Sequence, residues 1–284
     1  MALAIASNLQ SLNAQRNLEK ATSAMGTTFK RLSSGLRINS AKDDAAGLSI
    51  SNRMTAQIRG QNQAVRNAND AISLVQVADG ALDETVTALQ RMRELAVQAA
   101  NDTLISGDRE DLQKEVNQMV QEIQRISTNT KFNGQSLVQG SFEAGKIMHV
   151  GEDANQTLTV AISAVSVVAL GVNSTQVKFF SAAGGYTDAS MQVLAESLIG
   201  VVDRALNSVT DIRAGLGALQ NRFDSIIANL TNIAENTTAA RSRILDADIA
   251  AETAALTRNA IIQQAGAAIL AQANQSPQVA MKLL

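Results

Sequence analysis

The stretch LIGVVDRALNSVTDIRAGLGALQNRFDSIIANLTNI, residues 198–233, carries the strongest structural signal in the chain. Apolar side chains recur along it at alternating steps of four and three residues, namely Leu198, Val202, Ala205, Val209, Ile212, Leu216, Leu219, Phe223, Ile226, Leu230 and Ile233. A seam of this period, held for about five heptads, predicts a long helix that supercoils left-handedly with partner helices. We call these residues the 198–233 seam and expect their helix to run from about residue 188 to 238.

Two other segments have the periodicity of partner helices. The first carries apolar residues at two heptad positions, Ile58, Val65, Ile72 and Val86 at one, and Val75, Leu82, Leu89 and Ala96 at the other. The second repeats the four-three step at Leu112, Val116, Met119, Ile123 and Ile126. The sequence SGD at 106–108 separates the two, and Asp108 is the expected N-cap of the second helix.

The middle of the chain changes character. Residues 129–140 are rich in turn formers, and residues 146–162 predict two strands around a Gly-Glu-Asp turn. Residues 181–188 are expected to form a loop before the long helix. The most apolar stretch, 157–172, is shorter than the roughly 20 residues of a membrane-spanning helix and alternates like a strand. We therefore expect a soluble chain without membrane insertion.

Two stretches near the ends, residues 1–15 and the segment between Arg258 and Lys282, carry no charged side chain and are rich in amides. The N-terminal part predicts a helix through Leu18, Ala21, Met25, Thr28, Leu32 and Leu36. Near the C-terminus, Ile249, Leu256, Gln263 and Leu270 form one lane, and Ala255, Ile262 and Ile269 form another beside it. Such a helix is apolar on two faces. One face can pair with the N-terminal helix. The other is buried either inside a monomer or, as we favour, against further copies of the same protein.

Composition narrows the function classes. The net charge is −2 with both signs interspersed, so no basic face favours nucleic acid. Cysteine is absent, which excludes disulfides and thiolate sites. The chain has a single histidine, His149, expected on a strand as a surface or packing residue. We expect no enzyme activity and no cofactor, and an interaction protein remains.

The cluster RLSSGLRINSAKDDAAGLSI, residues 31–50, could suggest a metal site at Asp43 and Asp44, or a phosphate loop at Gly35 and Lys42. The spacing matches no phosphate-binding loop, and adjacent aspartates without further ligands rarely hold a metal. We instead expect Gly35 to end one helix and Asp43 or Asp44 to start the next.

Three long blocks resemble bacterial flagellins in content, order and distance from the ends: LSSGLRINSAKDDAAGLSISNRM (32–54), LQRMRELAVQAAND (89–102) and AARSRILDADIAAETAALTRNAIIQQAGAAILAQANQ (239–275). The resemblance covers roughly residues 1–140 and 190–284. It implies a structural subunit that polymerises into the helical flagellar filament used for swimming. The subunit would lie outside the cell, after type III export without a cleaved signal peptide. Its partners would be itself and flagellar export chaperone, cap and junction proteins.

The resemblance also implies site residues. The terminal helices would form the inner wall of a hollow tube, with amides turned toward the channel and packing at Leu9, Leu12, Ile249, Leu256, Ile262, Ile269 and Leu270. The flagellin-sensing Toll-like receptor of a host would bind an outer face that also meets a neighbouring subunit, at Gln90, Arg91, Leu95 and Glu115. Helical geometry places Arg91 opposite the seam positions of its own helix, and Leu95 four residues further is expected on the same outer face.

The expected fold is mainly α, with long antiparallel heptad-type helices in a rod-like bundle and a small β-hairpin tip in the middle of the chain. The expected domains are an inner coiled coil of 1–42 with 239–284, a helical rod of 43–140 with 188–238, and the short tip 141–187. A hook–filament junction protein, or another coiled-coil interaction protein such as a chemoreceptor-type signalling coil, remains the alternative.

Overall fold

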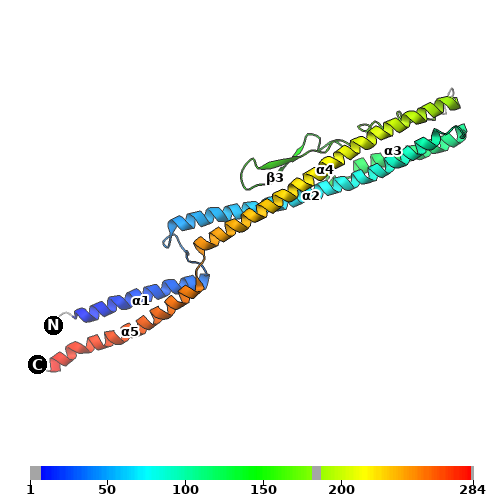
Figure 1. Cartoon of the computed structure of the whole chain (residues 1–284). Coiled ribbons are helices and arrows are strands. Elements are labelled where there is room, and N and C mark those ends of the chain that lie inside the picture. The colour runs from blue at the N-terminus through cyan, green and yellow to red at the C-terminus, as the bar shows by residue number, and fades with distance from the viewer. Residues whose placement is uncertain (1–7, 181–186, 283–284) are drawn as a thin grey trace. The chain divides into compact units, whose positions relative to one another are not determined.

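The computed structural model describes residues 8–180 and 187–282, and most of them lie in long helices (Figure 1). The elements are α1 (Leu9–Ser34), α2 (Ala45–Ala99), α3 (Ser106–Asn129), β1 (Lys131–Phe132), β2 (Gln135–Ser136), β3 (Lys146–His149), β4 (Thr157–Val160), α4 (Asp188–Leu245) and α5 (Ile249–Lys282). The expected mainly α class is confirmed. The long helix begins where the seam predicted and extends seven residues beyond the expected end at 238, to Leu245.

The chain forms two compact units. The terminal unit contains Met1–Ile58 and Ala234–Leu284, and the central unit contains Arg59–Ile233. The start of α2 and the end of α4 therefore belong with the termini. The expected loop at 181–188 falls largely outside the described residues, since 181–186 are not among them.

In the terminal unit, the connector between α1 and α2 has the caps that the sequence predicted. Gly35 ends α1 in the left-handed region, with φ of 70°. Asp44 starts α2, because its Oδ1 accepts a hydrogen bond from the Gly47 amide at 2.8 Å. The Asp43 carboxylate accepts bonds from the amides of Asn39 and Ser40 at 3.1 and 2.8 Å. Turn-forming hydrogen bonds thus account for both aspartates.

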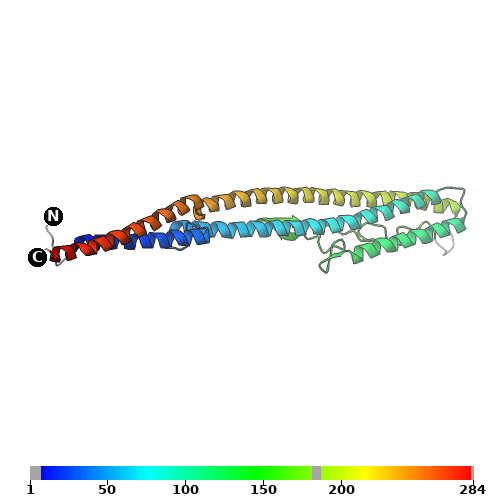
Figure 2. The same cartoon turned by 90° about the horizontal axis from the view of Figure 1, so that it is seen from below.

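The same unit pairs α1 with α5 in antiparallel fashion (Figures 1 and 2). At one end Arg31 forms an ion pair with Glu252 at 3.1 Å, and at the other the Ser11 hydroxyl donates to the Asn274 side chain at 2.7 Å. Between them the packing is close because α1 presents small side chains, and Ala14, Ala21 and Thr28 are its buried residues. The predicted pairing of the two ends is therefore present.

In the central unit, α2 and α4 lie side by side and antiparallel (Figure 2). Arg93 of α2 pairs with Asp203 of α4 at 2.7 Å. Arg213 of α4 reaches back to Asp79 and Asp83 of α2, at 2.8 and 2.7 Å. Most of the 198–233 seam is buried in the resulting core, at Leu198, Val202, Ala205, Val209, Leu216 and Phe223.

The end of the seam departs from the prediction. Ile226 and Leu230 are only half-buried, and Ile233 is 41% exposed. The segment that covers α4 begins at about Ala161, beside Gly215 and Leu219. The β3–β4 hairpin that precedes this segment bonds to α2 instead, so the last seam residues stay at the surface.

Two antiparallel hairpins lie between α3 and α4 in the sequence. β1 and β2 are joined by a two-residue turn of Asn133 and Gly134. Both residues have positive φ, as the type I′ turn of a two-residue hairpin requires. β3 and β4 are the two predicted strands, and His149 pairs with Thr157 at their turn end. The β3–β4 hairpin does not project from one end of the helices. It lies along α2, where Asn67 donates to the His149 carbonyl at 2.9 Å.

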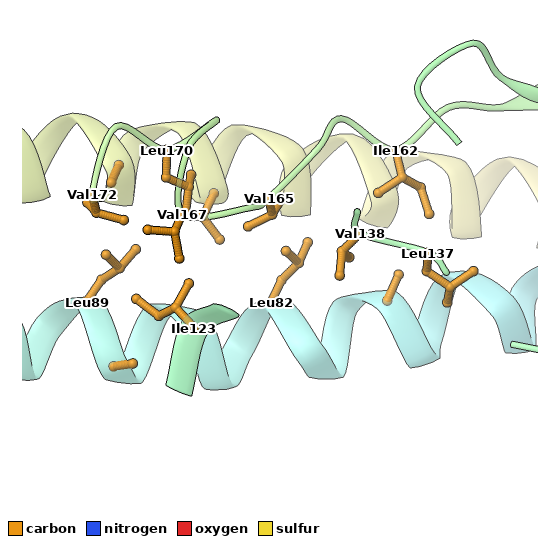
Figure 3. Close-up of a cluster of buried hydrophobic side chains, with 14 of the residues drawn as sticks. Leu82, Leu89, Ile123, Leu137, Val138, Ile162, Val165, Val167, Leu170 and Val172 are labelled. Atoms are coloured by element: carbon orange, nitrogen blue, oxygen red, sulfur yellow. The ribbon is translucent and has the colours of Figure 1, made fainter. Parts of the chain in front are cut away.

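Residues 161–180 form a strap without regular secondary structure along α2 and α4. Its apolar side chains enter the core, at Ile162, Val165, Val167, Leu170, Val172, Val177 and Phe179. Figure 3 shows Val167 and Val172 of the strap gathered with Leu82 and Leu89 of α2. The alternation seen in the sequence at 158–162 therefore marks inward-facing residues of β4 and of the start of the strap.

Candidate interaction surfaces

The paired terminal helices leave large apolar side chains at the surface. Leu9 and Leu12 of α1 and Ile249, Ile262 and Ile269 of α5 are all exposed, Leu9 by 66% and Ile269 by 58%. Leu256 and Leu270 are half-buried. We call these seven residues the terminal apolar face. A lone chain therefore exposes more apolar surface here than isolated surface leucines would explain.

A groove of about 520 Å³ runs between α1 and α5 within this unit. Alanines of α1, including Ala14 and Ala21, form one wall, and Ile262, Gly266 and Ile269 of α5 form the other. Phe29 of α1 and Ile261 of α5 are also exposed, by 65% and 60%, and sequence reasoning missed both. Phe29 directly follows Thr28, one of the periodic residues that predict this helix. Since neighbours on a helix lie about 100° apart, Phe29 falls off the periodic face.

The second candidate surface is built from α2 and α3. The Arg91 guanidinium donates to the Glu115 carboxylate at 2.9 Å and to Glu94 at 2.9 Å. The hydrogen bonds that Arg91 donates to Glu115, and then to Glu94, raise the pKa of Arg91 above its usual range. Gln90 beside them is exposed. We call Gln90, Arg91 and Glu115 the Arg91 surface. The structure brings Arg91 and Glu115 into contact, and Gln90 is the exposed neighbour of Arg91 on α2.

Leu95 does not share this surface. Its side chain is completely buried, together with Met92 and Ala96 of the same helix. The prediction assumed that α2 packs along a single seam, which would leave the opposite side open. In the structure α2 contacts α4, the strap and α3, so its buried arc is wider and includes the position four residues after Arg91.

The start of α3 also differs from the prediction. The N-cap is Ile105, and Asp108 lies within the first turn, where its carboxylate accepts a bond from the Ile105 amide at 3.2 Å. An acidic residue at this position can satisfy the N-cap amide from inside the helix, which lets the helix begin three residues earlier.

The side chains that could bind a metal are dispersed over the part of the chain that the structure describes. No group of three or more His, Asp or Glu side chains among them could hold a metal ion. His149 is exposed on β3. No helix in the described ranges is both long and apolar enough to span a membrane.

Two family models match the two helical ends of the chain. Residues 5–143 match the bacterial flagellin N-terminal helical region, and residues 199–284 match the bacterial flagellin C-terminal helical region. The chain belongs to the bacterial flagellin family. Flagellins are structural proteins, and the family identifies this flagellin as a subunit of the flagellar filament, which lies outside the cell.

Curated relatives agree over nearly the whole length. A flagellin of Halalkalibacterium halodurans is 44% identical over 277 residues, covering 98% of each chain. The flagellin of Bacillus subtilis is 40% identical over 302 residues, again covering 98% of each. A solved structure of a putative flagellar hook-associated protein from Vibrio parahaemolyticus matches with a TM-score of 0.60 at 13% identity, over 72% of this chain and 100% of the other. That likeness shows a shared fold only.

Proposed function

We propose that this flagellin assembles into a hollow helical filament for swimming, and that the terminal apolar face is buried between its copies. The observation that carries the proposal is the exposure of Leu9, Ile249 and Ile269 on the helix pair of α1 and α5. Burying apolar surface contributes about 25 cal/mol per Å², so repeated contacts of this face favour polymerisation.

The amides of α5 support a wet inner wall. Gln264, Gln272 and Asn274 are exposed, and no charged side chain lies between Arg258 and Lys282. Amides on the inner wall of the filament would bind water, yet they would form no ion pairs with an unfolded chain that passes along the channel. We propose accordingly that the subunit travels through a type III export channel of the flagellum, handled by an export chaperone and placed among cap and junction proteins.

Electron microscopy of the purified chain tests this proposal. A filament subunit should give long tubular filaments from a single polypeptide above a threshold concentration. Short caps, or rings that form only with other flagellar proteins, would instead indicate a junction protein. Persistently monomeric protein at high concentration would contradict the burial of the terminal apolar face between copies.

A second function, recognition by a host Toll-like receptor for flagellin, is favoured by the Arg91 surface. Arg91 is half-exposed, yet two carboxylates fix its guanidinium, so little side-chain entropy remains to be lost on binding. Arginine is a frequent anchor of protein interfaces because its planar fork makes several directed bonds. We propose that Gln90, Arg91 and Glu115 contact the receptor. Leu95 would support them from the core instead of contacting the partner.

A further inference from the structure

The inner face of α3 is polar at one end. Arg109 is completely buried and Gln113, one turn further, is 5% exposed. Between these two residues and the buried Ser127 near the other end, the same face is apolar, with Val116, Val120 and Ile123. Burying an arginine and a glutamine costs free energy unless their polar atoms find partners.

Arg109 finds partners at the C-terminal end of α2. Its Nε donates to the Ala99 carbonyl and its Nη2 to the Asn101 carbonyl, both at 3.0 Å. The last carbonyls of a helix have no partner within the helix and carry partial negative charge. α2 has no basic residue in its own last turn, so the neighbouring helix supplies the cation.

Gln113 binds the strap. Its Nε2 donates to the Val177 carbonyl at 3.1 Å, and its Oε1 accepts from the amides of Phe179 and Phe180 at 2.9 and 3.3 Å. A single side-chain amide therefore satisfies three backbone groups of a segment that has no sheet or helix partner there.

These bonds select one register of α3. An apolar face can slide and still find apolar neighbours, whereas a buried polar group is satisfied only at one position. A slip of α3 by one turn, about 5.4 Å, would leave Arg109 without the end of α2 and Gln113 without the strap. Glu115 lies two residues after Gln113, on the opposite side of the same helix. The same slip would therefore carry Glu115 away from Arg91.

We propose that Arg109 and Gln113 are positioning residues for the Arg91 surface, because they hold α3 in the register that places Glu115 beside Arg91. The surface needs Glu115 at this place, since the ion pair of Arg91 with Glu115 joins α2 to α3 there, at 2.8 Å. The biological role of this positioning rests on the proposed receptor function. The register itself does not.

The absence of cysteine makes the register measurable. Spin labels attached through Val97→Cys on α2 and Gln121→Cys on α3, both exposed positions, report the distance between the helices in the full-length monomer. We expect one narrow distance in the reference protein. Arg109→Met and Gln113→Met should each broaden it, or shift it by up to about one helical turn, 5.4 Å. Arg125→Met removes an exposed arginine of the same helix, paired with Glu122, and should leave the distance unchanged.

Receptor-reporter signalling by the same monomers completes the experiment. We expect Arg109→Met to lower signalling at least severalfold while Arg125→Met does not. An unchanged narrow distance in both buried variants would overturn the positioning role, and so would a change only in melting temperature. A shifted distance with full signalling would keep the positioning role and refute the receptor surface instead. Because Gln113→Met leaves the cap of α2 intact, it serves if Arg109→Met fails to fold.

Discussion

Arg91 and Leu95 show what a heptad pattern reveals at the scale of one residue. The positions of Val86 and Leu89 were sufficient to place Arg91 opposite the seam, and the structure shows its side chain about half-exposed. The same reasoning failed for Leu95, because the pattern of one helix does not contain the positions of its other neighbours. The burial of Arg109 and Gln113 could not be predicted for a related reason. Arginine and glutamine on a helix are expected in solvent unless a buried partner is known.

Replacing Arg91 by alanine tests the Arg91 surface. We expect receptor signalling by monomers to fall on the order of tenfold or more, because arginine anchors carry much of an interface's energy. Filament assembly should weaken as well. The melting temperature should change little, since exposed ion pairs contribute little to stability. The control is Arg93→Ala, which removes the neighbouring arginine that pairs with Asp203 of α4. Equal signalling by Arg91→Ala and the reference protein would remove Arg91 from the site.

Asp43 makes the connector sensitive to acid. Hydrogen bonds from the Ser40 hydroxyl, the Asn39 amide and the Ser40 amide lower the pKa of Asp43 below its ordinary value of 3.8. Because the folded connector favours the carboxylate, its stabilisation is present above pH 3.8 and is lost as the pH falls through the lowered pKa. The amide proton of Ser40 should therefore titrate with a midpoint below 3.8 in NMR spectra, and Asp43→Asn should abolish that titration. A midpoint at or above the ordinary value would contradict the turn geometry.

At the scale of elements, the sequence predicted the helices and strands that have a regular apolar period, and the caps that have characteristic residues. The helix of the seam, the two strands at 146–162 and the caps at Gly35 and Asp44 are all present. The course of the strap could not be predicted, because an irregular segment has no period and its place depends on polar bonds from elsewhere, such as those of Gln113. Ile233 shows the limit of the seam itself, since periodicity marks a face that can be buried without saying what covers it.

Phe223 and Ile233 therefore make a matched pair for a stability measurement. Phe223 is completely buried and Ile233 is 41% exposed, although both belong to the same predicted seam. Phe223→Ala should lower the free energy of unfolding by about 3–5 kcal/mol, the usual cost of removing a buried aromatic ring. Ile233→Ala should cost less than about 1 kcal/mol. Chemical denaturation of a trimmed monomer, residues 41–244, measures both, and similar losses would show that the core is misplaced.

At the scale of the whole molecule, the apolar periodicity of the two ends was informative. The C-terminal pattern predicted a helix that is apolar on two faces, one of which can pair with the N-terminal helix, and α1 and α5 do pair. The boundary of the terminal unit was not predictable. α2 and α4 run without a break through Ile58 and Ala234, so no sequence signal marks the change of unit.

Removing the ends tests their role in polymerisation. A chain lacking residues 1–40 and 245–284 keeps the core of the central unit and loses the terminal apolar face. We expect a helical monomer at every concentration, because the central core remains while the apolar surface whose burial between copies favours polymerisation is gone. Sedimentation and electron microscopy with filament seeds check the result. Normal filaments from the trimmed chain would refute the role of the ends.

The attachment of the β3–β4 hairpin to α2 determines where the chain can accept an insertion. Glu152 accepts a hydrogen bond from the buried Gln61 and packs on Gly60, so the first part of the turn is anchored. Ala154 and Asn155 are exposed, and the strand ends His149 and Thr157 are paired on either side. A foreign domain whose own termini lie close together could be inserted after Ala154 without prying the strands apart. The anchored hairpin can thus hold an inserted domain at its turn while its own strands stay paired.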